Sequence, residues 1–317
     1  MRRYGAENPL RNIRLTRRRF VFTAGASVAG ILLLKRMGGH DSLPDAPEEQ
    51  KEAEPHSFKT TMAFIRGTEI EDHVDLEQAN FDSLSTLAYF AAPLDREGNI
   101  LRGSRGYEAL NMHKTKRLFE KAKAAGTDIL LTVTQFNNTD METLLGNSVH
   151  SNNAIRQIVQ EVNSKGFGGA NIDFEYDGDA GELLRQQFSQ FIRVLKETMH
   201  RQVKSSQISV SVIPSAGKQS TLYDIAKLSQ VADSIVMMAY EYGSPRSSVV
   251  MPTAPMGGAT QGKYWGDIAT DIDAFLLHMP AEKLTVALPL YGLAFTARTP
   301  DMGVCAGRLD TIQFSFL

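Results

Sequence analysis

The sequence has only one cysteine, Cys305, so an intramolecular disulfide is impossible and a folded domain must rely on its hydrophobic core. A chain of 317 residues with 42% hydrophobic residues can form such a core. The seven histidines show no H-E-x-x-H pair or other tight ligand spacing, and no glycine-rich loop joins a strand pattern to a helix pattern. We therefore expect neither a metal ion nor a nucleotide cofactor.

Acidic residues outnumber basic ones outside the N-terminal region. Residues 1–36 hold nine Lys or Arg and one Glu, which leaves 25 basic and 35 acidic residues in the rest of the chain. An acidic body repels a polyanion, so we expect no nucleic-acid partner.

The N-terminal region also lacks an apolar run of the ~20 residues that a membrane-spanning helix needs. Its apolar stretch, residues 21–34, follows the segment T-R-R-R-F-V that starts at Thr16. This order resembles a twin-arginine export signal, and a buried helix with a basic flank is the alternative. The resemblance implies contact with the export machinery and a place in the periplasm or cell wall, or secretion. Residues 20–34 would be either a cleaved signal or a retained membrane anchor within the segment 1–36.

An acidic linker with several prolines, residues 37–57, follows the signal and shows no apolar periodicity. We expect the folded domain to occupy residues 58–317 and to act as a monomer.

Short apolar or β-branched runs alternate with helical patterns through this domain. The predicted strands are residues 60–66, 84–91, 128–136, 169–176, 207–214, 233–242 and 283–292. The predicted helices include residues 114–126, 153–166, 181–200, 222–232 and 267–279. Such alternation predicts a parallel sheet, and its length favours an α/β (β/α)8 TIM barrel over a doubly wound open sheet, which periodicity alone does not exclude.

No eighth strand pattern follows Arg298. We therefore expect a barrel without its eighth βα unit, as in a C-terminally truncated product. An unclosed barrel leaves two strand edges unpaired, which predicts low stability or aggregation unless another segment fills the gap.

The fourth predicted strand carries polar residues on one face. Asn171, Asp173 and Glu175 are spaced by two, so their side chains point the same way. Polar groups are costly to bury without partners, and at the carboxyl end of a barrel strand such a cluster indicates catalysis. A chance polar face or a structural ion-pair network is the alternative.

The segment from Phe167 to Glu175, F-G-G-A-N-I-D-F-E, resembles the signature F-D-G-x-D-x-D-x-E of glycoside hydrolase family 18. Gly169, Asp173 and Glu175 match, whereas Gly168 and Asn171 replace aspartates. The asparagine is similar to that of the subgroup related to spore-germination and cortex-lytic enzymes, which favours peptidoglycan as substrate.

The resemblance implies a substrate-assisted reaction in which the acetamide oxygen of the sugar attacks the anomeric carbon. Glu175 would be the general acid and then the base, with a pKa raised by burial and by Asp173. Asp173 would orient the acetamide, and Asn171 would donate a hydrogen bond to Asp173.

The sixth predicted strand contains M-A-Y-E-Y, which resembles the family's M-x-Y-D-[YF]. Tyr240 would donate to the acetamide carbonyl, and Glu241 replaces the aspartate that contacts the reacting sugar. One added methylene displaces that carboxylate by more than an ångström, so the role of Tyr240 transfers more directly than that of Glu241.

Aromatic side chains are candidates for stacking on sugar rings, although an aromatic residue on a strand is more often part of the core. The candidates are Tyr242, Tyr291 in a segment similar to the family's seventh strand, Tyr89 in the second strand, and Trp265.

Two functions remain open. The favoured one is a retaining glycosidase that cleaves β-1,4 linkages to N-acetylglucosamine in peptidoglycan or chitin-like glycans. The alternative is an inactive, lectin-like barrel that only binds the N-acetylated polysaccharide, or a non-functional truncated product.

Overall fold

The structure is a computed structural model that describes residues 60–243, 250–294 and 310–313. All of them belong to the unit Phe58–Leu317, one of the two units into which the chain divides. The predicted signal and linker and Cys305 lie outside the described residues. Among the described helices, none combines the length and hydropathy needed to cross a bilayer.

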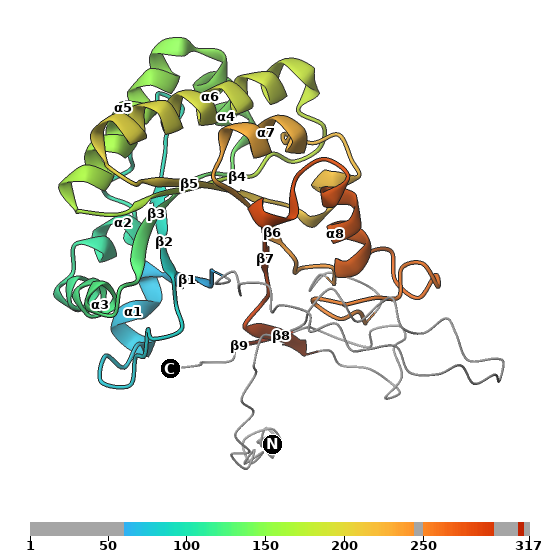
Figure 1. Cartoon of the computed structure of the whole chain (residues 1–317), viewed down its shortest axis with the longest axis horizontal. Coiled ribbons are helices and arrows are strands. Elements are labelled where there is room, and N and C mark those ends of the chain that lie inside the picture. Colours follow the sequence, from blue (N-terminus) through green and yellow to red (C-terminus); the bar gives the residue numbers. More distant parts are fainter. Residues whose placement is uncertain (1–59, 244–249, 295–309, 314–317) are drawn as a thin grey trace, which may run out of the picture. The chain divides into compact units, whose positions relative to one another are not determined.

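Seven parallel strands form one sheet, in which every strand pairs with its neighbour in the sequence (Figure 1). The strands are β1 Met62–Arg66, β2 Thr86–Pro93, β3 Asp128–Gln135, β4 Gly169–Phe174, β5 Gln207–Val212, β6 Ser234–Met238 and β7 Leu284–Ala287. A doubly wound sheet reverses its strand order, whereas a barrel keeps it. The structure therefore confirms the predicted barrel class, with seven parallel strands in the described residues.

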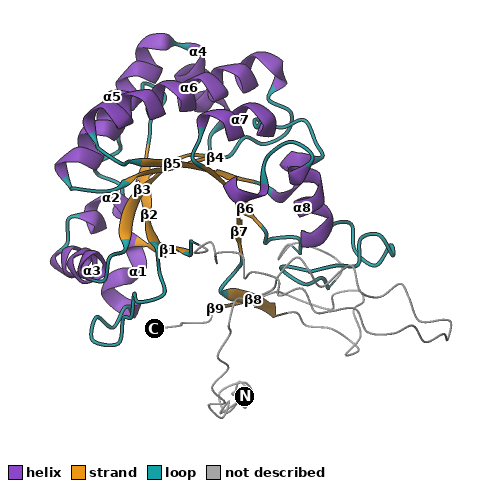
Figure 2. Ribbon diagram, viewed as in Figure 1, coloured by secondary structure: helices purple, strands orange, loops and turns teal. Residues whose placement is uncertain are grey.

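Helices cover the convex face of the curved sheet (Figure 2). They are α1 Gly67–His73, α2 Arg105–Leu110, α3 His113–Ala124, α4 Asn138–Gly146, α5 Ser148–Ser164, α6 Gly181–Gln202, α7 Ile225–Val231 and α8 Ile268–Leu276. Two 3₁₀ turns, η3 Pro214–Gly217 and η4 Ala281–Lys283, complete the described helical elements. The five predicted helices are present, and the short α1, α2 and α4 are additional.

The last predicted strand is split in the structure. The parallel sheet ends with β7 at Ala287, and β8, Tyr291–Ala294, instead pairs antiparallel with β9, Asp310–Gln313. Pro289 separates β7 from β8 and has no N–H with which to continue a ladder. The prediction of one strand over residues 283–292 was therefore wrong at its C-terminal half, and Tyr291 belongs to β8.

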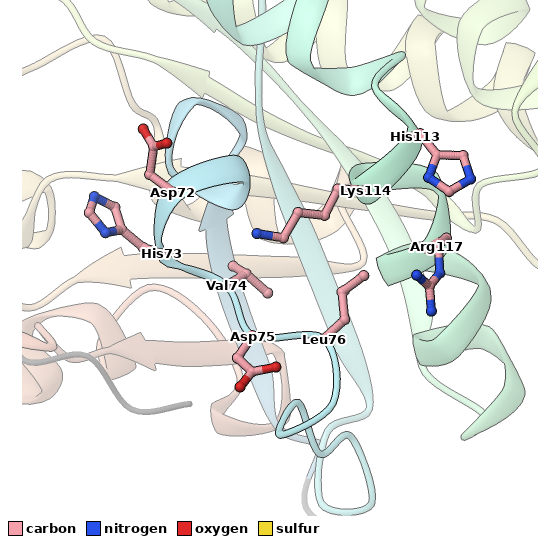
Figure 3. Close-up of a pocket in the computed structure, with 8 residues that line it drawn as sticks. All are labelled: Asp72, His73, Val74, Asp75, Leu76, His113, Lys114 and Arg117. Atoms are coloured by element: carbon pink, nitrogen blue, oxygen red, sulfur yellow. The ribbon is translucent and has the colours of Figure 1, made fainter.

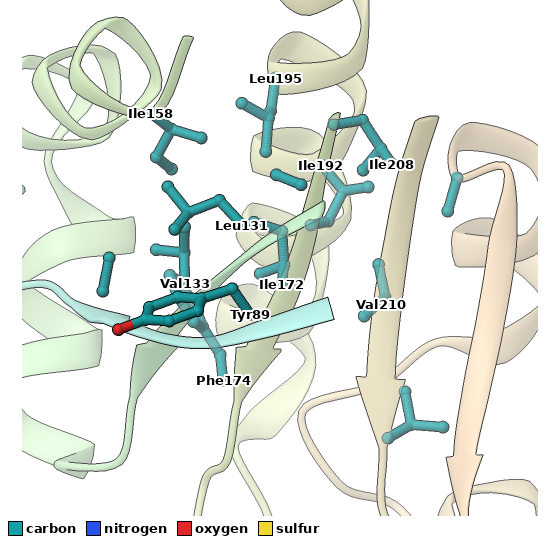
Figure 4. Close-up of a cluster of buried hydrophobic side chains, with 14 of the residues drawn as sticks. Tyr89, Leu131, Val133, Ile158, Ile172, Phe174, Ile192, Leu195, Ile208 and Val210 are labelled. Atoms are coloured by element: carbon teal, nitrogen blue, oxygen red, sulfur yellow. The ribbon is translucent and has the colours of Figure 1, made fainter. Parts of the chain in front are cut away.

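The hydrophobic core lies between the sheet and the helices (Figure 4). Alternate strand residues point outward into this core, among them Leu131, Val133, Ile172 and Phe174. The residues between them therefore face the concave side of the sheet.

Gly169 begins β4 at the closest approach of β4 to β5. Its φ is 149°, and a Cβ there would lie 1.9 Å from the carbonyl oxygen of Gln207. Only glycine fits this position without a shift of one strand, because any other residue would clash with that backbone. The tight start of β4 sets the register of the polar residues that follow.

Candidate active site

The concave face of β4 carries the predicted polar residues. In the β3–β4 register, Thr132 lies opposite Asn171 and Thr134 lies opposite Asp173. Glu175 directly follows β4, and its backbone N–H donates to the carbonyl oxygen of Gln135 at 3.0 Å. The three polar residues thus form a row that runs from the middle of β4, at Asn171, to its carboxyl end, where barrels build their sites.

Asn171 is fully buried and held by two serines of β5. Ser209 donates to its amide oxygen at 2.8 Å, and its amide nitrogen donates to Ser211 Oγ at 3.0 Å. The expected donation from Asn171 to Asp173 is replaced by this contact with Ser211. Ser209 lies opposite Asn171 in the β4–β5 register, and Ser211 is two residues further along β5. Both serine side chains therefore lie on the same face of the sheet as Asn171.

Asp173 is 4% exposed, and its Oδ1 atom has no hydrogen-bond partner. Burial, with the neighbouring charge of Glu175, raises the pKa of Asp173 to about 7. Burial and then the charge of Glu241 also raise the pKa of Glu175. Both carboxyl groups therefore hold a proton more firmly than carboxyl groups in water, as a general acid requires.

Tyr240, Glu241 and Tyr291 meet beyond the end of β6. The rings of Tyr240 and Tyr291 are 6.3 Å apart in an edge-to-face arrangement, and the Tyr291 hydroxyl donates to Glu241 Oε1 at 3.4 Å. Burial and then the charge of Asp173 raise the pKa of Tyr240, so its hydroxyl remains a proton donor. Glu241 has a φ of 61°, a left-handed conformation that turns the chain at this point.

Tyr242 and Trp265 form a pair with opposite exposure. Tyr242 is 2% exposed and its hydroxyl donates to Asp271 of α8, whereas Trp265 is 67% exposed and its ring lies 5.8 Å from that of Tyr242. A sugar cannot stack on the buried ring of Tyr242, so the structure leaves Trp265 as the accessible aromatic surface of the pair.

Tyr89 lies in the core and not on the concave face (Figure 4). Its hydroxyl donates to the carbonyl oxygen of Gly106, and its ring packs against Phe119 of α3. The adjacent Phe90, opposite Thr132 in the β2–β3 register, shares the face of the site instead. A buried ring cannot stack on a sugar, so the prediction for Tyr89 was wrong; the sequence does not show which way a strand faces.

Two further residues near Glu175 were missed by the sequence reasoning. Phe136 directly follows β3, is 52% exposed, and is adjacent in sequence to Gln135, whose carbonyl oxygen accepts from the Glu175 N–H. Its place at the end of the predicted strand 128–136 could have indicated it. Tyr223 is buried after β5, and its hydroxyl donates to the carbonyl oxygen of Phe174 at 2.8 Å. No sequence pattern marks that contact.

A hollow of about 490 Å³ lies elsewhere, between α1 and α3 (Figure 3). It is lined by Asp72, His73, Val74, Asp75, Leu76, His113, Lys114 and Arg117. None of the predicted site residues lines it. Within the part of the chain that the structure describes, no group of three or more His, Cys, Asp or Glu side chains could hold a metal ion.

The sequence model of the family described as "Glycosyl hydrolases family 18" matches residues 64–310. The chain belongs to glycosyl hydrolases family 18. This membership confirms the resemblance predicted from the strand that ends in Glu175, and it places the chain in a family of glycosidases.

Family-18 relatives include Chitotriosidase-1 of Mus musculus, 26% identical over 213 residues, which are 63% of this chain and 45% of the relative. The Cortical fragment-lytic enzyme of Bacillus subtilis (strain 168) is 25% identical over 185 residues, which are 55% of this chain and 39% of the relative. The chain thus spans less than half the length of these two relatives.

The fold agrees with a solved family-18 structure, the Ostrinia furnacalis Group IV chitinase in complex with allosamidin. It superimposes with a TM-score of 0.67 over 80% of this chain and 71% of the chitinase chain, at 20% identity. At this identity the likeness concerns the fold alone.

Proposed function

We propose that the protein hydrolyses β-1,4 linkages to N-acetylglucosamine by a retaining, substrate-assisted reaction. The observation that carries this proposal is the pair Asp173 and Glu175, two carboxyl groups with raised pKa on one face at the carboxyl ends of the strands. A carboxyl group with a raised pKa keeps its proton to higher pH, which suits it to general-acid catalysis.

In the proposed reaction, Glu175 gives its proton to the glycosidic oxygen while the substrate acetamide oxygen bonds to the anomeric carbon. The leaving sugar departs, and a cyclic oxazolinium ion remains. Glu175, now a carboxylate, then takes a proton from water, whose oxygen attacks the anomeric carbon and opens the ring. The product keeps the β configuration because the carbon is inverted twice.

Asp173 and Tyr240 would hold the acetamide during these steps. Asp173 Oδ1, buried and without a hydrogen-bond partner, is an acceptor that an acetamide N–H could use. The Tyr240 hydroxyl, kept protonated by burial, is the complementary donor for the acetamide carbonyl. These two groups would fix the nucleophilic oxygen beside the reacting carbon.

We propose peptidoglycan as the preferred glycan. Support comes from the Asn171 variant, from the export signal proposed for residues 1–36, and from a relative whose name specifies cortical fragments. Export would bring a monomeric enzyme to the cell wall, and chitin-like glycans present the same acetamide group.

A glycan-binding protein without turnover is the second candidate. It is favoured by the exposure of the first strand, since Phe64 of β1 is 39% exposed on the concave side. A site open on this side could retain a glycan without enclosing the bond to be cleaved.

The test compares the full chain and its Glu175→Gln variant on peptidoglycan sacculi and on chitin oligosaccharides, with products identified by mass spectrometry. Glu197→Gln, at a surface position of α6, is the matched control. We expect Glu175→Gln to lower kcat by about 10²- to 10⁴-fold while affinity persists. Equal affinity of all three proteins with no reducing ends released by any would refute hydrolysis and support glycan binding.

A further inference from the structure

The peptide that joins Phe174 to Glu175 is held from both sides. On the side of β3, the Glu175 N–H donates to the Gln135 carbonyl oxygen at 3.0 Å. On the other side, the Phe174 carbonyl oxygen accepts from the hydroxyl of Tyr223 at 2.8 Å. One contact is a regular strand interaction, and the other comes from a side chain 49 residues away in the sequence.

The Tyr223 hydroxyl binds the Phe174 carbonyl at a point where β4 and β5 no longer pair. The β4–β5 register ends where Ile172 lies opposite Val210, so Phe174 is beyond its last pair. β5 itself ends at Val212, and the 3₁₀ turn η3 begins at Pro214. Without the Tyr223 hydroxyl, the β4–β5 ladder would leave the Phe174 carbonyl without a partner, and an unsatisfied buried acceptor is destabilising.

Tyr223 is itself fixed in one orientation. It is 4% exposed, its ring lies 6.1 Å from that of Phe188 on α6, and Phe188 in turn packs 5.8 Å from Phe174. Its backbone N–H donates to Thr221 Oγ1 at 3.3 Å. The hydroxyl therefore has little freedom to leave the Phe174 carbonyl.

The hydroxyl of Tyr223 also remains a donor at every working pH. Burial, followed by the charges of Asp173 and Glu175, raises the pKa of Tyr223 well above its ordinary value. The Tyr223 hydroxyl is therefore close enough to Asp173 and Glu175 to interact with their charges.

We propose that Tyr223 is a positioning residue of the hydrolytic site, whose hydroxyl fixes the Phe174–Glu175 peptide and so the direction in which Glu175 presents its carboxyl group. The inference rests on the proposed function, because it assigns Tyr223 a part in that reaction. Misplacement of a catalytic group by about 1 Å can cost roughly 10²-fold in rate, so a single hydrogen bond to this peptide can control turnover.

The test is Tyr223→Phe in the full chain, which keeps the ring and removes only the hydroxyl. We expect kcat to fall about 10- to 100-fold while KM changes less than about twofold, since Glu175 acts on the transition state and not on substrate binding. Amide hydrogen exchange at Glu175 should become faster, because its peptide is then held from one side only.

Tyr107→Phe is the matched control. Tyr107 is also buried, and its hydroxyl donates to Glu161 at 2.7 Å, on the helix side of the sheet. We expect this variant to lose stability without a change in kcat or in exchange at Glu175.

A Tyr223→Phe protein with the kcat and the Glu175 exchange rate of the wild type would overturn the positioning role while leaving hydrolysis intact. Loss of kcat in Tyr107→Phe to the same extent would also overturn it, because the effect would then be general destabilisation. If the wild type and Glu175→Gln are equally inert, hydrolysis fails, and the exchange rate at Glu175 alone decides whether Tyr223 holds the peptide.

Discussion

The stability of Asp173→Asn relative to the wild type should be greater at high pH than at low pH. Asp173 is 4% exposed, its Oδ1 atom has no hydrogen-bond partner, and its pKa rises from 3.8 to about 7 through burial and the neighbouring Glu175. The folded chain therefore binds a proton at this position more tightly than the unfolded chain. Stability from this group is present below about pH 4 and is lost as the pH rises towards and through about 7.

The magnitude follows from the two pKa values. At 1.36 kcal/mol per pH unit, the rise from 3.8 to about 7 corresponds to about 4 kcal/mol of stability lost by pH 8. Roughly 2.5 kcal/mol of that loss falls between pH 5 and pH 8. Asparagine has nearly the same shape and does not ionise, so the variant should lack this loss. Any cost of burying its amide is nearly the same at both pH values and cancels in the difference.

The assay is urea denaturation of the full chain at pH 5 and pH 8, with Asp82→Asn at an exposed position as the control. The free energy of unfolding of Asp173→Asn, relative to wild type, should increase by about 2–3 kcal/mol between the two pH values. The control should show no comparable change. If the stability of Asp173→Asn relative to wild type is the same at both pH values, the pKa of Asp173 is not raised, and the folded protein does not disfavour the charged form of this carboxyl group. Turnover should fall in the same variant, since the uncharged asparagine oxygen is a weaker acceptor than a carboxylate and cannot offset the positive charge of the proposed oxazolinium ion.

Gly169→Ala should lower the free energy of unfolding by at least about 3 kcal/mol in a urea titration, because its Cβ would lie 1.9 Å from backbone of β5. Gly103→Ala, whose Cβ would meet nothing within 4 Å, is the control, and equal losses would contradict the tight start of β4. Trp265→Ala should weaken oligosaccharide binding by about 1 kcal/mol, or roughly fivefold in Kd by calorimetry, and unchanged affinity would show that the glycan does not stack on this ring. Replacing Arg17 and Arg18 with lysine should leave the protein in the cytoplasm, as judged by fractionation and immunoblotting. Undiminished export would show that residues 1–36 do not act as a twin-arginine signal.

The sheet could be predicted from the sequence because its strands are buried on the helix side and read as apolar, β-branched runs. β3 and β4 begin at the residues predicted for them, Asp128 and Gly169. Helices α1, α2 and α4, of six to nine residues, were missed, whereas the equally short α7 and α8 were predicted because apolar residues continue their patterns over residues 222–232 and 267–279.

The polar face of β4 could be predicted since alternation within one strand needs no knowledge of its neighbours. The faces of Tyr89 and Tyr242 could not. The apolar residues of β2 do not alternate with polar ones, so its sequence does not distinguish its two faces, and the period of two ends after Met238, where β6 stops before Tyr242 is reached. The contacts of Asn171 with Ser209 and Ser211 likewise depend on inter-strand register, which no single segment contains.

The exposed ring of Trp265 gives the protein an optical reporter. It is the only tryptophan among 317 residues, so the indole fluorescence of the chain has one source. Because this ring is 67% exposed beside Tyr242, a sugar that covers it would exclude water and shift the emission maximum to shorter wavelength. The proposed binding of a glycan at Trp265 can therefore be followed in the unmodified protein, without a label and without a background of other indoles to subtract.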